Sequence, residues 1–482
     1  MSETITEMIL PGTYIEVRSE GLIGVGGIAT GNVGVVGTAS RGPLGQVVVL
    51  GSYSEALDTF GPYDRWPEGR NPTPDAQAQV LSLTRVLEQV FSGGASSVYA
   101  VRIASASVIN MASMSWTLTS ATNATLLTLT ASSPGTWANA INATLNAPNG
   151  KPVTLTLTLG RVKETFTGAD ARELAQSIRD GSRFVTVSGP ANADQSTVPK
   201  NVVASNVLGG PNGAQITATE IAAGLAALEN QPVNIVVAGG VDASTTGVAA
   251  AMLTHLEATE NEGRERIAVI GASSDDAATI IANDVSKGSS PRLILVAPRI
   301  VATDANRAGE LNPNVNLPAS YAAALVAGKL ATLAPHISLT NQGVAAADLA
   351  TEYTRAQQKQ LLGNQVLVLF KHLGIRVLKG ITTDTGAFRQ ISVRRIVDYA
   401  KAGVRIGANP YIGRLNNPRV RAALKATLDG FLSGMVLDEM LTAYQLDVSA
   451  TRAQEINGQA IVTMTLQPTF SIDYIKVIMN LQ

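Results

Sequence analysis

The chain has 482 residues, a formal net charge of −1 and no cysteine. This length allows two or three domains with substantial cores. The absence of cysteine excludes disulfides, thiolate metal sites and thiol nucleophiles, and the near-zero charge gives no whole-molecule field that would attract nucleic acid or an anionic membrane. Charged residues make up only 15% of the chain, which suits a subunit that covers much of its surface with neighbouring copies.

The first part of the chain predicts strands and one helix of an α/β domain. Short apolar or alternating runs predict strands at residues 13–18, 33–36, 47–50 and 97–103. A proline-rich loop follows the third strand, and the spacing of Val80, Leu83, Leu87 and Val90 predicts a helix over residues 75–91. The first ten residues carry two glutamates and no long apolar run, so we expect no signal peptide and accumulation in the cytoplasm.

The middle of the chain changes character twice. Residues 111–207 are rich in threonine with alternating polarity, which predicts a mostly β insert interrupted by one helix at 169–180. Helices then alternate with short apolar runs, with helices at 218–229, 245–259 and 275–284 and strands at 233–238, 267–270 and 293–297. This alternation predicts a largely parallel sheet covered on both faces, so the insert interrupts one α/β domain.

The last section, from about residue 360, predicts an α+β arrangement. Its elements are a strand at 375–378, a strand-to-helix stretch at 388–404, a long helix at 418–441, and strands at 444–448, 460–466 and 472–481. The final strand is apolar almost to the last residue, whereas chain ends are usually polar and frayed. An exposed apolar strand pairs readily with another chain. We therefore predict that both ends of the chain are completed by a partner, such as a neighbouring copy.

Positive charge is concentrated late in the chain. Between Lys371 and Asp429 there are 12 basic and 3 acidic residues, a net charge of +9, so the remainder of the chain carries −10. Such segregation suits contact with an acidic partner or head-to-tail contact between copies. The alternative is a solvated helix face. Nucleic acid is a weaker hypothesis, because no aromatic residues are interleaved for base stacking.

Catalytic motifs are almost absent from the sequence. The three histidines are far apart, and the Gly-x-Gly-x-x-Ala run at residues 24–29 is followed by a strand-like stretch rather than by a helix that could hold a pyrophosphate. We therefore expect no catalytic residue, no metal and no cofactor. The enzyme alternative places a site at strand-end loops near Asp242 and Ser274. The simpler interpretation is that Ser274 or Asp275 caps the next helix.

Several motifs, spread over almost the whole chain, resemble those of contractile tail sheath proteins of bacteriophages and related injection machines. They include a Pro-Gly-x-Tyr-Ile-Glu start and a Ser-Pro-Gly-x-Trp turn in which Ala138 replaces the usual glycine. A Gly-Ile-Arg-Val run has Leu378 where tryptophan is common, and a Val-Arg-Arg run follows it. The matching segments are residues 10–16, 33–43, 133–139, 374–380 and 391–396, whereas residues 299–318 fit the family's usual loop poorly.

The resemblance implies an α/β and α+β multidomain fold and a structural role. It implies a parallel α/β middle domain with an inserted mostly-β domain, plus an inner α+β domain formed by the C-terminal region and terminal strand arms. The corresponding divisions are 1–25 (N-terminal linking arm), 26–108 with 212–350 (middle domain), 109–211 (peripheral insert), 351–470 (inner, tube-facing domain) and 471–482 (C-terminal linking strand). In this family, arms link stacked six-membered rings around an inner tube, and contraction drives that tube through a membrane.

Applied to this chain, the resemblance assigns two sets of residues. The strand arms would use Tyr14, Ile15, Val17, Tyr474, Ile475, Val477 and Ile478. Arg419, Arg421 and Lys425 would face an acidic tube. The implied partners are further copies of the chain, the inner tail tube protein, and baseplate and tail terminator proteins, with no direct nucleic acid and no membrane insertion. The implied location is the virion tail, assembled in the host bacterial cytoplasm. Another virion shell or baseplate protein is the remaining structural alternative.

Overall fold

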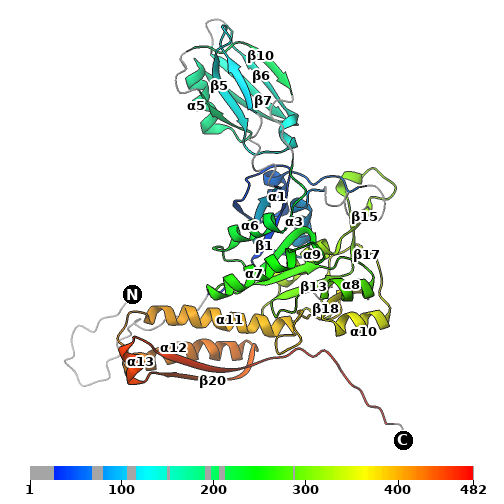
Figure 1. Cartoon of the computed structure of the whole chain (residues 1–482), viewed down its shortest axis with the longest axis vertical. Helices are drawn as coiled ribbons and strands as arrows, with labels where there is room; N and C mark the ends of the chain where they lie inside the picture. The colour runs from blue at the N-terminus through cyan, green and yellow to red at the C-terminus, as the bar shows by residue number, and fades with distance from the viewer. Residues whose placement is uncertain are drawn as a thin grey trace, which may run out of the picture. The chain divides into compact units, whose positions relative to one another are not determined.

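The computed structural model describes residues 27–67, 80–105, 115–148, 152–189, 197–205, 212–285 and 288–480. These residues divide into two compact units. We call them the sheet unit, within Ala29–Arg394 and Ile472–Gln482, and the ribbon unit, within Met1–Ile28 and Arg395–Ser471. The fold is mixed α/β, with one large, mostly parallel sheet and several small antiparallel sheets (Figure 1). At this level the predicted fold class is confirmed.

A nine-stranded sheet organises the sheet unit, in the order β16-β19-β18-β13-β12-β11-β1-β3-β2. Its parallel centre consists of β18 (Val366–Lys371), β13 (Leu293–Ala297), β12 (Ile267–Gly271), β11 (Ile235–Asp242), β1 (Val33–Thr38) and β3 (Val98–Ile103). Antiparallel strands close the two edges: β2 (Val47–Leu50) on one side, β19 (Ile375–Val377) and β16 (Gly343–Val344) on the other. Every residue of β1 is buried, as expected for a strand covered on both faces.

Helices cover both faces of this sheet. One hydrophobic core contains side chains of α1 (Tyr53–Phe60), α3 (Leu83–Ser92) and α9 (Ala319–Ala331). The other contains side chains of α6 (Ala218–Leu228), α7 (Val248–Asn261), α8 (Ala277–Asn283) and α10 (Arg355–Gly363). The predicted sheet with two covered faces is therefore present. It also includes β18 and β19, which lie beyond residue 350.

Helix α9 is the most deeply buried of the helices that the sequence pattern failed to predict. Almost all of its residues are buried, because a helix inside a core is apolar on every side and has no amphipathic stripe to detect. Its Gly328 packs so closely on α3 that a Cβ would collide with the carbonyl oxygen of Val90. Two other elements, α1 and β18, were not predicted either, and within the described residues the predicted helix over 75–91 begins only at Leu83.

Two small antiparallel sheets form the threonine-rich insert. The first sheet has three strands, in the order β4 (Ser115–Thr119), β5 (Thr125–Ala131) and β9 (Val185–Ser188). The second has four strands, in the order β10 (Val202–Ser205), β6 (Ile141–Asn146), β7 (Val153–Leu159) and β8 (Val162–Gly168). Helix α5 (Ala171–Gly181) and the short η1 (Thr136–Ala140) accompany them. Buried and exposed residues alternate along β6, which is the period of a strand with one face on a core. Elsewhere in the sheet unit, β15 (Asn314–Leu317), β14 (Ile300–Thr303) and β17 (Asp348–Leu349) make a further antiparallel sheet beside η3 (Ala305–Arg307).

A buried arginine holds a turn of the insert, the one that follows β5. Arg102, fully buried, donates hydrogen bonds to the carbonyl oxygens of Gly42 (2.8 Å) and Pro134 (2.7 Å). Burial lowers the pKa of Arg102 to about 10. Gly135, which follows Pro134, has φ of 144°, and a Cβ at this position would collide with the carbonyl of Ser40. The Ser-Pro-Gly turn is therefore fixed by backbone contacts that only glycine permits.

The ribbon unit contains two long helices and a two-stranded sheet. Its elements are α11 (Ile391–Ala408, which begins at the end of the sheet unit), η4 (Asn409–Tyr411), α12 (Pro418–Leu437), β20 (Leu441–Ser449), α13 (Arg452–Ile456) and β21 (Ile461–Pro468). The Asn417 side chain caps α12 by accepting a hydrogen bond from the N–H of Val420 (2.9 Å), with Pro418 in the first turn. The rings of Tyr399 and Phe431 lie 5.8 Å apart between the two helices.

Candidate assembly surfaces

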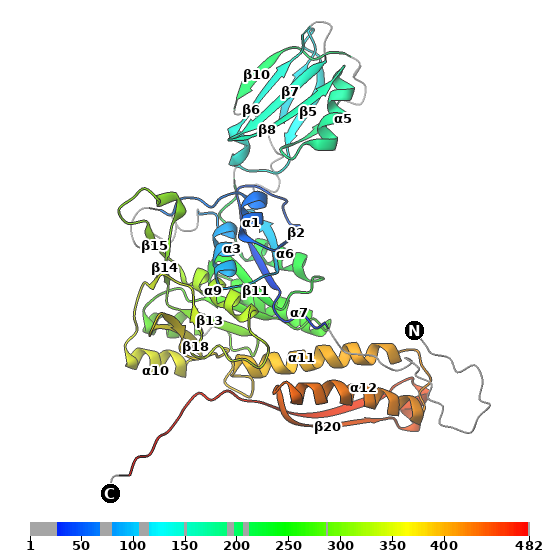
Figure 2. The ribbon, with the colours of Figure 1, turned by 180° about the vertical axis from the view of Figure 1, so that it is seen from behind.

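The C-terminal segment is an exposed apolar stretch. We predicted a strand at 472–481, but residues 472–480 form no strand within the chain. Figures 1 and 2 show them as an extended trace with no strand beside it. The apolar and aromatic side chains are between 72 and 84% exposed: Ile472, Tyr474, Ile475, Val477, Ile478 and Met479. Such a segment offers main-chain hydrogen-bonding groups and apolar side chains together.

One residue of this segment is held firmly. The carboxylate of Asp473 lies 3.0 Å from Nζ of Lys379, accepts a hydrogen bond from Nε2 of Gln390 (3.0 Å) and accepts another from Oγ1 of Thr340 (3.3 Å). The same Nζ donates to the hydroxyl of Tyr474 (3.1 Å) and lies 4.8 Å from the centre of its ring. The segment therefore begins at a polar anchor within the sheet unit.

The β20–β21 ribbon has one apolar and one polar face. Tyr444 pairs with Leu466 and Leu446 pairs with Met464, and these four side chains pack on the core between the ribbon and the helices. The residues that alternate with them along the two strands face the other way, and those such as Asp447, which lies opposite Thr463, are exposed. The strands predicted at 444–448 and 460–466 are therefore present, within β20 and largely within β21. In the described part of the chain, β20 and β21 pair only with each other, so the outer edge of each strand has no partner strand there.

The three basic residues predicted to face a tube lie in different environments on α12. Arg421 is half-buried and makes an ion pair with Glu455 at 2.9 Å, and its guanidinium lowers the pKa of that carboxyl. Lys425 is exposed and lies 3.5 Å from the Asp447 carboxylate. Arg419 is exposed and has no carboxylate partner among the described residues. The predicted N-terminal arm residues, Tyr14, Ile15 and Val17, lie outside the described residues.

The strand-end loops of the enzyme alternative hold structural contacts. Asp242 accepts hydrogen bonds from the backbone N–H groups of Ser244 (2.9 Å) and Thr245 (3.2 Å), so it stabilises a turn. The predicted cap at Ser274 or Asp275 was wrong by one or two residues, because Asp276 caps α8 and Asp275 pairs with Arg299 at 2.6 Å. In the described parts of the chain, no group of three or more metal-ligating side chains occurs.

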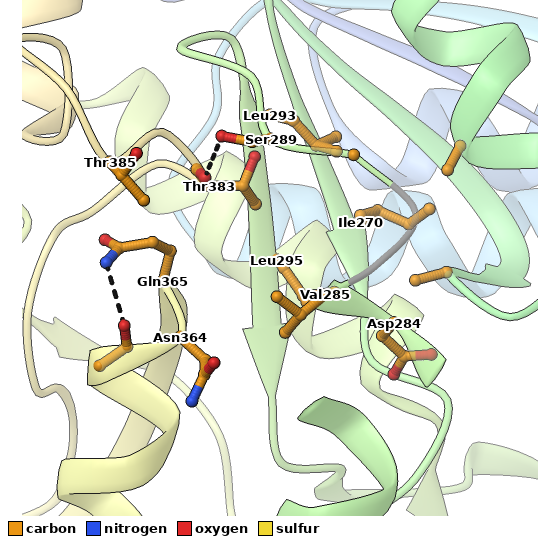
Figure 3. Close-up of a pocket in the computed structure, with 14 residues that line it drawn as sticks. Ile270, Asp284, Val285, Ser289, Leu293, Leu295, Asn364, Gln365, Thr383 and Thr385 are labelled. Carbon is orange, nitrogen blue, oxygen red and sulfur yellow. Dashed lines mark hydrogen bonds between the residues drawn. The ribbon is translucent and has the colours of Figure 1, made fainter. Parts of the chain in front are cut away.

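A small pocket lies in the sheet unit (Figure 3). Its cavity of about 160 Å³ is lined largely by apolar side chains, including Ile270, Val285 and Leu295. The carboxylate of Asp284 is already satisfied by Ser273, whose hydroxyl donates to it at 2.8 Å. Among the described residues that line the pocket, no histidine or lysine stands beside a hydroxyl to act as the base of a nucleophile.

Comparison with known families decides the identity of the fold. A model of the phage tail sheath protein central domain matches residues 214–383, and a model of the phage tail sheath C-terminal domain matches residues 383–482. Together they cover more than half of the chain. The chain belongs to the phage tail sheath protein family. As a sheath protein it is structural rather than enzymatic, and the predicted family and the predicted function, a subunit of a contractile tail sheath, are both confirmed.

Solved sheath structures share this fold. A sheath tail protein from Desulfitobacterium hafniense aligns with a TM-score of 0.62 at 18% identity, over 95% of this chain and 100% of that one. One from Listeria innocua aligns with a TM-score of 0.68 at 14% identity, over 92% and 93%. The helical sheath of the anti-feeding prophage in its contracted state aligns with a TM-score of 0.53 at 14% identity, over 98% and 99%. Comparison with curated proteins found no match.

The anchor residues of this sheath protein were not singled out from the sequence. Lys379 was counted as one of twelve late basic residues and lies in the matching segment 374–380, but neither observation gave it a role, and Thr340 and Gln390 carried no signal. Their role depends on a contact with Asp473, far away in the chain, which no local pattern reveals.

Among the described residues, no helix is sufficiently long and apolar to cross a membrane.

Proposed function

We propose that this sheath subunit polymerises by strand addition, with residues 475–480 of one copy pairing with an outer edge of the β20–β21 ribbon in a neighbour. One observation carries the proposal: the chain contains both an exposed, unpaired apolar segment and a ribbon whose outer edges have no partner strand among the described residues. Pairing through main-chain hydrogen bonds is strong and tolerant of sequence. It can persist while side-chain contacts between subunits change.

The side-chain pattern of the segment suits that edge. In a strand, alternate residues face opposite sides, so Ile475, Val477 and Met479 share one face and Lys476 and Asn480 share the other with Ile478. The first set would continue the apolar face of the ribbon that contains Leu446 and Met464. The polar members of the second set would lie beside the exposed face, which contains Asp447 and Thr463.

The family resemblance supports a larger assembly. In this proposal, residues 1–25 and 471–482 are linking arms, residues 26–108 with 212–350 form the middle domain, residues 109–211 project outward, and residues 351–470 face an inner tail tube. Six-membered rings stack around that tube, bounded by baseplate and tail terminator proteins. Contraction releases free energy held in a metastable extended lattice and drives the tube through a cell envelope. The sheath is assembled in the host bacterial cytoplasm.

Contact with the tube is best assigned to the exposed face of α12. Of the three basic residues there, Arg419 has its guanidinium available for a partner, whereas Arg421 and Lys425 already interact with carboxylates of their own chain. An acidic tube surface would attract this face, and the attraction would weaken as salt is added.

Truncation after Tyr474 tests strand addition. The purified variant should keep the secondary structure of the intact subunit but form no sheath-like tubes in negative-stain microscopy and no pelletable polymer. A double substitution, Ile475→Asp with Val477→Asp, should have the same effect because it places charge on the apolar face of the added strand. The matched control is Lys476→Gln, which changes the polar face without adding negative charge beside Asp447 and should still polymerise. Tubes of normal length from the truncated chain would overturn the proposal.

A further inference from the structure

We propose that Lys379 is a positioning residue for polymerisation, because with Thr340 and Gln390 it fixes Asp473 and so sets the point from which the linking segment leaves its own subunit. This inference rests on the proposed strand addition. The observation that supports the inference is that one carboxylate of the segment, that of Asp473, is buried. The Asp473 side chain is 9% exposed, whereas its neighbours Ile472 and Tyr474 are 80 and 82% exposed. The segment is thus held by one charged group and not by packing of its apolar residues.

The groups that hold Asp473 are themselves fixed by the sheet. Lys379 follows β19, and the preceding residue, Leu378, donates its N–H to the carbonyl of Val368 in β18 (2.8 Å). Oγ1 of Thr340 accepts a hydrogen bond from the N–H of Gly380 (3.1 Å). Gln390 forms a bridge with Ile381 at the start of α11. Three supports from separate parts of the chain therefore meet at one carboxylate, which gives the anchor a defined position.

An anchor at this point shortens the mobile part of the segment. Residues 475–480 reach about 20 Å when extended. Without the anchor, Asp473 and Tyr474 would no longer be held by Lys379, so the mobile part of the segment would begin further upstream and be longer. A longer mobile linker lowers the effective concentration of the segment at a neighbour's ribbon, and ordering it on binding costs more conformational entropy.

Loss of the anchor should release the segment without unfolding the subunit. A buried carboxylate that loses its cation is usually left uncompensated in a core. Here the flanking residues are exposed, so Asp473 can move into water when Lys379 is removed. The expected effect of Lys379→Met is therefore on segment mobility and on polymerisation, with little change in the unfolding midpoint of the subunit.

A spin label can measure the anchor directly, because the chain contains no cysteine. Ile475→Cys carries the label next to the anchor and Met479→Cys carries it near the free end, both in subunits kept below the polymerisation concentration. We expect restricted motion at position 475 and greater motion at 479. Adding Lys379→Met, or Asp473→Asn as a second variant, should make position 475 as mobile as 479. The matched control is Lys371→Met, which removes an exposed ion pair with Asp348 (2.9 Å) in the same unit and should leave both spectra unchanged.

Polymerisation gives the functional readout. Without labels, Lys379→Met should raise the concentration needed for sheath assembly by roughly three- to tenfold, as expected for a looser linker, whereas Lys371→Met should not. Equal mobility at position 475 with and without Lys379, or an unchanged assembly concentration, would overturn the anchor. Normal assembly of the chain truncated after Tyr474 would instead overturn strand addition, and the label spectra would still report whether Asp473 is anchored.

Discussion

The nine-stranded sheet and the β20–β21 ribbon differ in the length of their edge strands. The outermost strands of the large sheet are β16, with two residues, and β2, with four, and such short strands offer little to an incoming chain. The ribbon strands have nine and eight residues, and in the described part of the chain neither has a second partner. Within the described residues, the ribbon therefore has longer edges without a partner strand than the nine-stranded sheet has, and these are the edges that the proposed strand addition would use.

This contrast indicates where stability and assembly reside. The large sheet is covered on both faces by helices, and its strands β1, β12 and β13 are buried along their whole length. A two-stranded ribbon alone is marginally stable, and here only one of its faces packs on helices. Polymerisation would add strands to the weaker of the two sheets, so substitutions in the two units should have different effects on the free subunit and on the polymer.

The largest expected effect is a cavity beneath the nine-stranded sheet. Leu325 of α9 is completely buried, so Leu325→Ala should lower the free energy of unfolding by about 2–5 kcal/mol. Denaturant unfolding of the free subunit measures this change. The control is Leu311→Ala, at a fully exposed leucine in the same unit, which should change stability by less than about 0.5 kcal/mol. Equal effects would mean that α9 is not part of a packed core.

A smaller effect is expected on the apolar face of the ribbon. Met464 is half-buried against the helices, so Met464→Ala should lower the stability of the free subunit by about 1–2 kcal/mol, less than a fully buried methionine would. Thr463→Ala, on the opposite face, is the control and should be nearly neutral. If strand addition stabilises the ribbon, the Met464→Ala subunit should regain part of the lost stability in the polymer. Thermal unfolding scans of the free subunit and of the polymer measure this difference. An equal loss of stability in both would mean that the ribbon is not an assembly site.

A third prediction concerns pH and the sheet unit. Burial, together with the nearby Arg266 guanidinium, lowers the pKa of His255 from 6.5 to about 4, and Nε2 lies 2.7 Å from Nη1 of that arginine. Between these values the unfolded chain binds more protons than the folded chain, so stability should fall as pH drops from about 6.5 to 4. The contribution of His255 to this loss should be on the order of 1–2 kcal/mol.

The histidine variant isolates that contribution. His255→Gln keeps an acceptor for Arg266 but does not titrate, so its unfolding free energy should vary less with pH over the same range. His372→Gln, at an exposed histidine, should keep the profile of the unmodified chain. Identical profiles for all three proteins would show that His255 does not contribute.

The smallest effect on the free subunit is expected at the exposed basic face. Arg419→Glu should leave the unfolding free energy unchanged, because the side chain has no partner in its own chain among the described residues. It should reduce co-assembly with the tail tube several-fold at low salt, with the difference disappearing at high salt. Arg421→Glu should instead lower the unfolding free energy, because it replaces the ion pair between Arg421 and Glu455 with two like charges. Co-sedimentation at two salt concentrations checks the assignment, and an unchanged Arg419→Glu result would remove it.

Much of the large sheet was predictable because its strands are short apolar runs separated by helices. Residues 233–238, 267–270 and 293–297 were predicted as strands and overlap β11, β12 and β13. Helix α9 was missed for the same physical reason that makes it central: a helix surrounded by core has no polar face. The last predicted strand, residues 472–481, has the composition of a strand, but over residues 472–480 it pairs with no other strand among the described residues.

The sequence by itself determined which residues share a face and where charge and apolar character accumulate. It predicted the strands at 444–448 and 460–466, the parallel sheet, the apolar final segment and the excess of basic residues after Lys371. Only the tertiary structure decided what each face meets. Arg394 and Arg395 are buried, Arg421 pairs with Glu455, and Lys379 holds Asp473. Periodicity follows from local backbone geometry, whereas a charge finds its partner only after distant segments have packed together.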